Sequence, residues 1–254
     1  MLIEDLKDKP PNRLIIGVGD EVDSISRADH RHKLEDLKPK FASTKVYPRL
    51  ITEEYEDLAN IYAKYTNKDE WLGHISGNHP LILCEKTQVD PVMSLCKELD
   101  HPYLGYSAFV PILIDASGRR ISCMLMCHHG FGGTNARKEG SSLNAYIDHA
   151  LRFEGWDIAA YGHRHDKWVK VVPRIKPQES GFAKRSPWIR AVDRVVLQCG
   201  TYLRTLSHSD YPTYSEKAGY PPRPLGCVKL NIGMDRVREG GRDNISLRVK
   251  SCSV

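Results

Sequence analysis

Four short polar clusters in the sequence contain side chains that can bind a divalent metal ion. The clusters are Gly19-Asp20, Gly77-Asn78-His79, His128-His129-Gly130 and Gly162-His163-Arg164-His165. Carboxylate oxygen, amide oxygen and imidazole nitrogen suit borderline divalent metals such as Mn, Fe or Zn. Two histidines separated by one residue, as His163 and His165 are, can flank a single ion. The residue types therefore predict metal coordination.

Each cluster follows a short apolar run with the pattern of a β-strand. The runs are residues 14–19, 72–77, 124–127 and 158–162. In α/β sheets, ligands bind outside the carboxyl ends of the strands, so four loops on neighbouring strands would meet at one point. A single Gly-Asp or Gly-Asn-His is usually a turn or a helix cap. Only the four clusters together, in this order, favour a metal site.

Hydrophobic periodicity predicts the elements that position these clusters. Helices are expected over residues 1–9, 52–65, 91–99 and 141–153, and strands over residues 13–19, 71–76, 108–114, 121–127, 157–161, 168–172, 191–198, 228–232 and 245–249. Thr52 is the expected N-cap of the second helix, and residues 175–187 and 207–225 are expected to be loops. Helices and strands alternate first, and strands dominate the last third. This order predicts one α/β domain over residues 1–254, a two-sheet sandwich with helices outside.

The composition is that of a globular protein. The 254 residues carry a formal net charge of +5, and no apolar run approaches the roughly 20 residues that a membrane helix needs. The amino-terminus lacks the apolar segment of a secretory signal. Seven cysteines without a Cys-x-x-Cys pair predict reduced thiols in a cytoplasmic protein. The mildly basic charge permits nucleic acid or another phosphate-bearing partner but does not require one.

The four clusters resemble, in the same order, the motifs of the calcineurin-like metallophosphoesterases. Gly19-Asp20-Glu21-Val22-Asp23 is similar to the family's Gly-Asp-x-x-Asp, and Gly77-Asn78-His79 is similar to its Gly-Asn-His-Asp/Glu. Cys127-His128-His129-Gly130 resembles its strand-end histidine motif, and Gly162-His163-Arg164-His165 resembles its Gly-His-x-His. The resemblance covers residues 13–232 and extends to phage-type members through residues 200–226. It implies a two-sheet αββα sandwich that lacks its first strand.

The resemblance also implies metal ligands. Asp20 would bridge two ions of Mn, Fe, Zn or Ni, and His165 would bind the first ion. The second ion would be bound by Asn78, His163 and one of the pair His128 and His129. His128 is preferred because related His-His-Pro sequences use their first histidine, but both remain open.

Three further roles follow from the resemblance. His79 would not bind metal but would stabilise the phosphate or protonate the leaving oxygen. Asp20 and Asn78 would be the other catalytic residues. Asp23 would accept a hydrogen bond from a metal ligand.

The implied activity is metal-dependent hydrolysis of a phosphate ester by a metal-activated hydroxide, as in a phosphodiesterase or a nuclease-like enzyme. The implied substrates include nucleotides and nucleic acid. The alternative is a degenerate, inactive phosphoesterase fold that binds nucleic acid or a protein partner. A structural zinc protein is disfavoured, because such sites use closely spaced Cys and His pairs.

The sequence departs from the family at two points. No Asp-x-His precedes Asp20, so the first ion would keep only Asp20 and His165. Either the chain begins after the strand with this motif, as the helix-like residues 1–9 favour, or the protein is a divergent member with one metal. Pro80 stands where the family has Asp or Glu. The residues that could replace the missing ligands are Asp29, His30 and His32, and the basic residues that could contact a phosphate are Arg137, Lys138, Arg164 and Lys167.

Overall fold

The computed structural model describes residues 1–22, 47–116, 118–132, 140–177, 189–203, 206, 216, 219–239 and 242–253. Its helices are α1 (Leu2–Lys7), α2 (Tyr47–Tyr65), α3 (Asn78–Thr87), α4 (Pro91–Leu99) and α5 (Ser141–Ala150), with a short 3-10 helix at Lys68–Glu70. Its strands are β1 (Ile15–Gly17), β2 (Trp71–His74), β3 (Ser107–Ala116), β4 (Arg119–His128), β5 (Ile158–Tyr161), β6 (Lys167–Pro177), β7 (Ile189–Cys199), β8 (Lys229–Glu239) and β9 (Arg242–Ser253). The predicted α/β class is confirmed.

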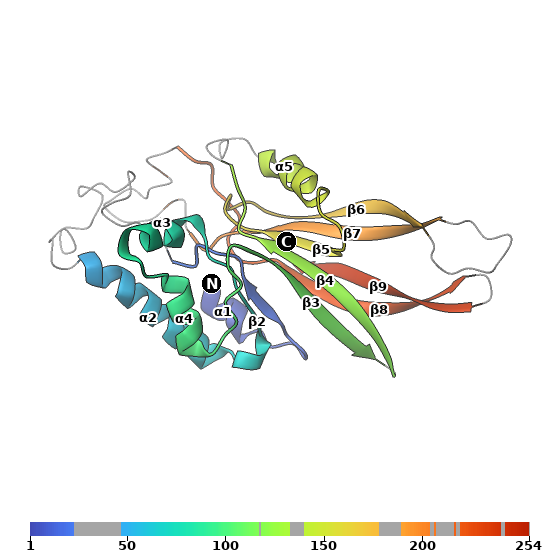
Figure 1. Ribbon diagram of the computed structural model, residues 1–254, viewed down its shortest axis with the longest axis horizontal. Helices are drawn as coiled ribbons and strands as arrows, with labels where there is room; N and C mark the ends of the chain where they lie inside the picture. Colours follow the sequence, from blue (N-terminus) through green and yellow to red (C-terminus); the bar gives the residue numbers. More distant parts are fainter. Residues whose placement is uncertain are drawn as a thin grey trace.

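A five-stranded mixed sheet with the order β3-β4-β5-β7-β6 lies at the centre of the fold (Figure 1). The outer pairs β3–β4 and β6–β7 are antiparallel, and β5 is parallel to both β4 and β7. Since β4, β5 and β7 run in the same direction, their carboxyl ends lie side by side at one end of the strands. Strands β1 and β2 form a separate parallel pair, and β8 and β9 form an antiparallel hairpin.

Both faces of the central sheet are packed. Helix α5 lies over one face (Figure 1), where Tyr146, Trp156 and Tyr161 are fully buried. The opposite face has its own core of sheet residues, and side chains of β1, β2, β8 and β9 pack against it. The sheet is therefore enclosed by a helix on one side and by the strand pairs β1–β2 and β8–β9 on the other.

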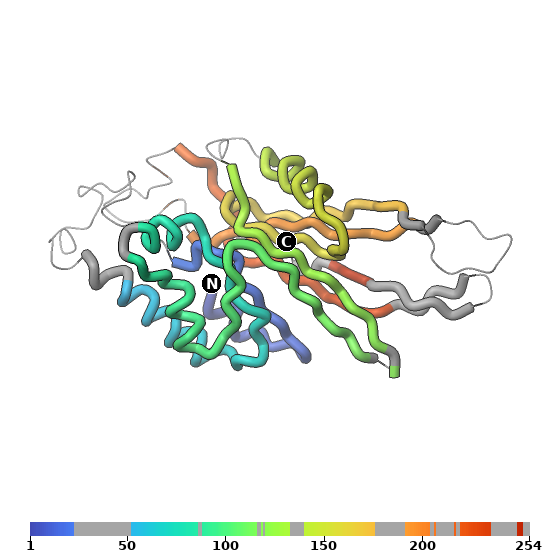
Figure 2. Tube along the Cα trace, in the orientation of Figure 1, coloured from blue at the N-terminus to red at the C-terminus, as the bar shows by residue number. Residues whose placement is uncertain are grey.

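A third core lies around the amino-terminal elements. In Figure 2 the blue amino-terminal segment lies beside the cyan and green helices α2 and α4. Leu6, Tyr62, Trp71 and Leu95 are buried there against one another. This core supports β1 and β2, whose carboxyl ends lead to the first two polar clusters.

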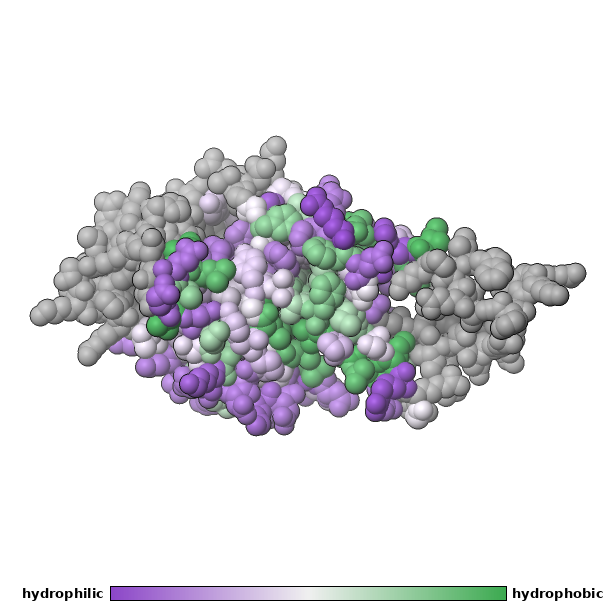
Figure 3. Space-filling model, viewed as in Figure 1, coloured by the Kyte–Doolittle hydropathy of each residue, from purple (hydrophilic) through white to green (hydrophobic). Residues whose placement is uncertain are grey.

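Strand β3 is an edge of the central sheet and carries exposed apolar side chains. Apolar residues gather over the β3–β4 hairpin in Figure 3, where Phe109 is 48% and Leu113 is 63% exposed. Pro111 lies between them and has no N–H to donate to a further strand. Such a proline disfavours edge-to-edge pairing with another chain.

Most predicted elements are present, with three corrections. Helix α2 begins at Tyr47, so Thr52 lies inside the helix and is not its N-cap. Residues 78–87 form helix α3, which the sequence pattern did not predict. Strand β6 extends to Pro177, so the beginning of the predicted loop 175–187 is strand. Residues 178–188 and most of 207–225 lie outside the described residues.

No helix in the described part of the chain combines the length and the apolar character needed to cross a membrane.

A buried histidine in the third core predicts a loss of stability in mild acid. Burial, and then the neighbouring His74 ring, lowers the pKa of His101 to about 4, whereas imidazole in an unfolded chain has a pKa near 6.5. Between these values the unfolded state binds a proton that the folded state does not, so stability is present above pH 6.5 and falls as the pH decreases towards 4. We expect His101 to account for about 1 kcal/mol of this fall between pH 7 and pH 5.

Urea unfolding at the two pH values measures this effect. The His101→Gln variant should lose less stability over the same interval than the unmodified protein. An equal loss in both proteins would assign the pH dependence to other groups.

Candidate metal centre

Four loops bring potential metal ligands together at the carboxyl ends of four strands. Asp20 follows β1, and Asn78 begins α3 just after β2. His129 follows β4 directly, and His163 follows β5. The ligand atoms of Asp20, His129 and His163 all lie within 4.8 Å of one another. In the described part of the chain, this is the one group of three or more histidine, cysteine or acidic side chains that is arranged in this way.

Asn78 joins this group through its side-chain oxygen. Its Oδ1 lies 3.0 Å from Nε2 of His129 and 2.9 Å from Nδ1 of His163. Nε2 of His129 also lies 3.1 Å from Oδ2 of Asp20. Neighbouring ligands of an octahedral ion, each about 2.1 Å from it, are about 3 Å apart. The observed separations therefore match those expected around one divalent cation.

Backbone carbonyl groups fix the protonation of both histidines. Nδ1 of His129 lies 2.8 Å from the Val18 carbonyl oxygen, and Nε2 of His163 lies 3.0 Å from the Gly132 carbonyl oxygen. A carbonyl oxygen only accepts, so each of these nitrogens must carry the proton and donate it. In a neutral imidazole the other nitrogen is then bare. Burial is the main cause that lowers the pKa of His163, which favours its neutral form.

The bare nitrogens face oxygens that also only accept hydrogen bonds. His129 Nε2 and His163 Nδ1 both point to the Asn78 Oδ1, and His129 Nε2 also points to the Asp20 carboxylate. Lone pairs from four side chains therefore converge without a proton between them. A divalent cation satisfies all four, and carbonyl-oriented imidazoles are the usual arrangement at metal sites.

Asp20 is held as a carboxylate. Burial alone would raise the pKa of this carboxyl, whereas the His79 ring and the His79 backbone N–H lower it, as a protonated His129 ring does in the absence of a metal ion. That N–H belongs to the first turn of α3 and donates to Asp20 Oδ1 over 3.1 Å. The amino-terminal end of a helix carries partial positive charge, which stabilises an anion. Asp20 is therefore ionised over the whole physiological pH range.

Two glycines of the sequence motifs allow these loops to approach closely. Gly19 has φ +88°, and a Cβ on it would lie 2.5 Å from Nδ1 of His129. A Cβ on Gly77 would overlap the Asp20 carboxylate. Larger residues at either position would force the Asp20 turn away from α3 and His129.

His79 lies next to the centre but is not one of the converging ligands. Its Nε2 is 3.9 Å from Oδ2 of Asp20, and its side chain is 20% exposed. It therefore lies between the Asp20 carboxylate and solvent, where it can meet a bound ligand.

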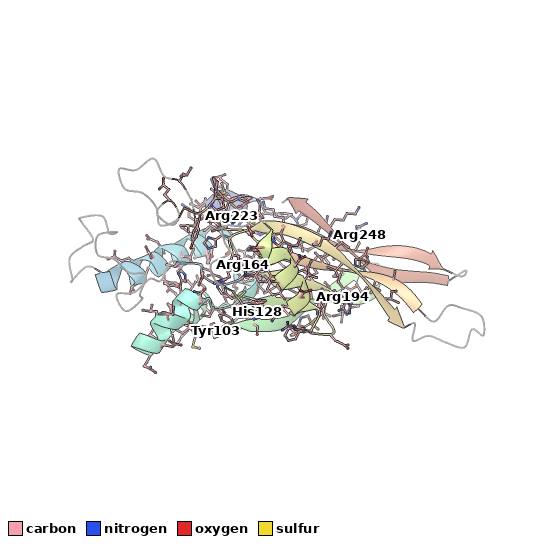
Figure 4. All side chains as sticks on the ribbon, turned by 90° about the horizontal axis from the view of Figure 1, so that it is seen from above. Tyr103, His128, Arg164, Arg194, Arg223 and Arg248 are labelled. Carbon is pink, nitrogen blue, oxygen red and sulfur yellow. The ribbon has the colours of Figure 1, made fainter. Side chains whose placement is uncertain are left out.

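The structure places His128 outside the centre. Its Nδ1 accepts a hydrogen bond of 2.8 Å from the Gly130 N–H, and its ring packs edge-on against His149 beside α5 (Figure 4). Burial is the main cause that lowers the pKa of His128 to about 4. The preference for His128 as the ligand does not fit this geometry, because His129 occupies that place.

The remaining predicted residues fall into four groups. His165 has a left-handed backbone with φ 59° and does not belong to the converging group. Arg164 donates to the Phe131 carbonyl oxygen and to Ser141, beside α5 (Figure 4), and Lys167 donates to the Leu225 carbonyl oxygen. Pro80 is buried in the first turn of α3. Outside the described residues lie Asp23, Asp29, His30, His32, Arg137 and Lys138.

Several contacts around the site have no counterpart in the sequence patterns. Tyr106 packs edge-on against His128 and His129, and its hydroxyl donates to the Gly130 carbonyl oxygen over 3.3 Å. Asp166, the residue after His165, is paired with Arg223 and accepts from Ser142. These contacts connect segments far apart in the sequence, and no local pattern indicates them.

Comparisons with known proteins return no relatives. No family model matches the sequence, and no curated protein and no solved structure matches the chain.

Proposed function

We propose that this protein is a metal-dependent phosphoesterase with the two-sheet αββα fold of the calcineurin-like family, acting as a phosphodiesterase or a nuclease-like enzyme. The observation that carries the proposal is the convergence of unprotonated lone pairs from Asp20, Asn78, His129 and His163. Those four residues are the ones that would hold a divalent ion of Mn, Fe, Zn or Ni. A divalent ion at this place supplies Lewis acidity to a phosphoryl oxygen and to water.

The residues around the ligands suit an anionic substrate. The amino-terminal end of α3, which bears His79 and points at Asp20, attracts phosphate groups as well as carboxylates. His79 is partly exposed beside Asp20 and can donate a hydrogen bond to a phosphoryl oxygen or a proton to the leaving oxygen.

An arrangement without metal is the main competitor. If the Asn78 amide were turned, its nitrogen could donate to both rings. The bare Nε2 of His129 and Oδ2 of Asp20 would still face each other at 3.1 Å, and both would be acceptors. Without a metal ion, this contact therefore requires a proton shared between the two atoms.

Hydrolysis of a generic phosphodiester tests the proposed activity. With Mn²⁺ added, the protein should cleave bis(p-nitrophenyl) phosphate, and Asn78→Ala and His163→Ala should each abolish this cleavage. Asn144→Ala, on the exposed side of α5, is the matched control and should keep full activity. Equal activity in all of these proteins would refute the proposal. Salt-sensitive DNA binding without Mn²⁺ uptake or hydrolysis would instead support the degenerate binding protein.

A further inference from the structure

The residue after Asp20 forms a buried pair behind the metal centre. The Glu21 side chain is 7% exposed, and its Oε1 lies 2.6 Å from Nδ1 of the fully buried His74 on β2. On its other side, Nε2 of His74 lies 3.0 Å from Nδ1 of His101. The Trp71 ring stacks on both histidines, at centroid distances of 4.3 and 4.9 Å. None of these four side chains is used by the proposed reaction.

The space for this pair is created by a glycine on β1. A Cβ on Gly17 would overlap Oε1 of Glu21 and would lie 2.7 Å from Nδ1 of His74. The other Glu21 oxygen, Oε2, is buried without a hydrogen-bond partner among the described residues. Burying a carboxylate oxygen without a hydrogen-bond partner costs folding free energy. Stability alone therefore does not account for the pair, and a role in the site does.

The pair connects the two loops that carry Asp20 and Asn78. Glu21 belongs to the turn after β1, and His74 is the last residue of β2, four residues before Asn78. The backbone of His74 is fixed by Pro102 and Leu104, since its N–H donates over 2.9 Å and its carbonyl oxygen accepts over 2.8 Å. A bond from Glu21 to His74 therefore ties the Asp20 turn to a rigid strand.

The Asp20 turn requires such a restraint. Asp20 has φ 53°, a left-handed conformation that aspartate adopts more readily than most residues but still at some cost. The Asp20 carboxylate is held by the hydrogen bond that it accepts from the His79 N–H at the start of α3. The next residue, Glu21, is held by its hydrogen bond to His74 on β2. Asp20 is thus anchored to α3 and Glu21 to β2, and these two anchors fix the direction of the Asp20 side chain.

On the basis of the proposed metal centre, we propose that Glu21 is a positioning residue that keeps the Asp20 carboxylate in register with Asn78, His129 and His163 through its bond to His74. Its role is to set metal affinity, and it contacts neither metal nor substrate.

Calorimetric titration of the whole protein with Mn²⁺ tests this role. Glu21→Ala should weaken Mn²⁺ binding about 10–100-fold, as loss of a supporting partner of a metal ligand does. Glu21→Gln should bind nearly as well as the unmodified protein, because its amide oxygen can still accept from the Nδ1–H of His74. Gly17→Ala should also weaken binding, since its methyl group takes the place of the Glu21 carboxylate. In the Glu21→Ala background the same change should add less, because only its close contact with Nδ1 of His74 remains.

Tyr103→Phe is the control for a general loss of stability. It removes the hydroxyl that donates to Asp90, the N-cap of α4, over 2.5 Å, and should lower stability without changing Mn²⁺ affinity. The positioning role would be overturned if Glu21→Ala bound Mn²⁺ as tightly as the unmodified protein does. It would also be overturned if Tyr103→Phe lost as much Mn²⁺ affinity as Glu21→Ala. Failure of the unmodified protein to bind Mn²⁺ is a different result, because it would overturn the metal centre itself.

Discussion

Replacing His129 with alanine should abolish tight Mn²⁺ binding, whereas replacing the adjacent His128 should not. The bare Nε2 of His129 faces both Asp20 and Asn78, so its removal leaves the ion with at most three protein ligands. Loss of a residue that only hydrogen-bonds a metal ligand typically lowers metal affinity about 10–100-fold. His129 is proposed to bind the ion directly, so its loss should lower the affinity at least about 100-fold. Hydrolysis should fall with it.

The neighbouring pair gives this experiment a matched control. His128 has the same side chain, but its ring lies beside His149 and accepts from the Gly130 N–H. His128→Ala should therefore lower stability and keep Mn²⁺ affinity close to that of the unmodified protein. Loss of binding in His128→Ala with retention in His129→Ala would show that the first histidine of the pair is the ligand.

Replacing Trp156 with alanine should cause a large loss of stability. Trp156 is fully buried, and its Nε1–H donates to the carbonyl oxygens of Ala150 and Phe153. The Arg194 guanidinium lies over its ring at 4.7 Å. Truncation of such a side chain leaves a cavity and typically costs 3–5 kcal/mol, so we expect about 4 kcal/mol.

Chemical unfolding followed by circular dichroism measures this loss. Phe153→Ala is the comparison, because Phe153 is 40% exposed in the same part of the structure and should cost clearly less. A loss below about 1 kcal/mol for Trp156→Ala, the level of an ordinary surface change, would show that this core is not packed as described.

Elements with strong local signals were predicted well from the sequence. Helix α4 begins at Pro91, as predicted, because Asp90 caps it and proline suits the first turn. The β3–β4 hairpin joins the two strands predicted over residues 108–114 and 121–127. The sequence pattern does not predict helix α3, because no side chain caps it and its first residues, Asn78 and His79, belong to the polar cluster expected after a strand. Pro80 in its first turn was the available signal.

The choice between His128 and His129 shows why the site was predicted only in part. Alternation along β4 places His128 on the face of Met126, which packs in the core beneath α5. Sequence alone does not reveal which face a distant helix covers, so it could not exclude His128. The hydrogen bond from His129 to Val18 spans 111 residues, and the Glu21–His74 pair spans 53. Contacts at such separations depend on the tertiary fold and not on any local pattern.

The most direct test of the metal centre is a crystal structure of the Mn²⁺-soaked protein with an anomalous difference map. We expect one strong peak about 2.1–2.3 Å from Asp20 Oδ2, Asn78 Oδ1, His129 Nε2 and His163 Nδ1. A map without a peak among these atoms, with the Asn78 amide nitrogen donating to both histidines, would contradict it.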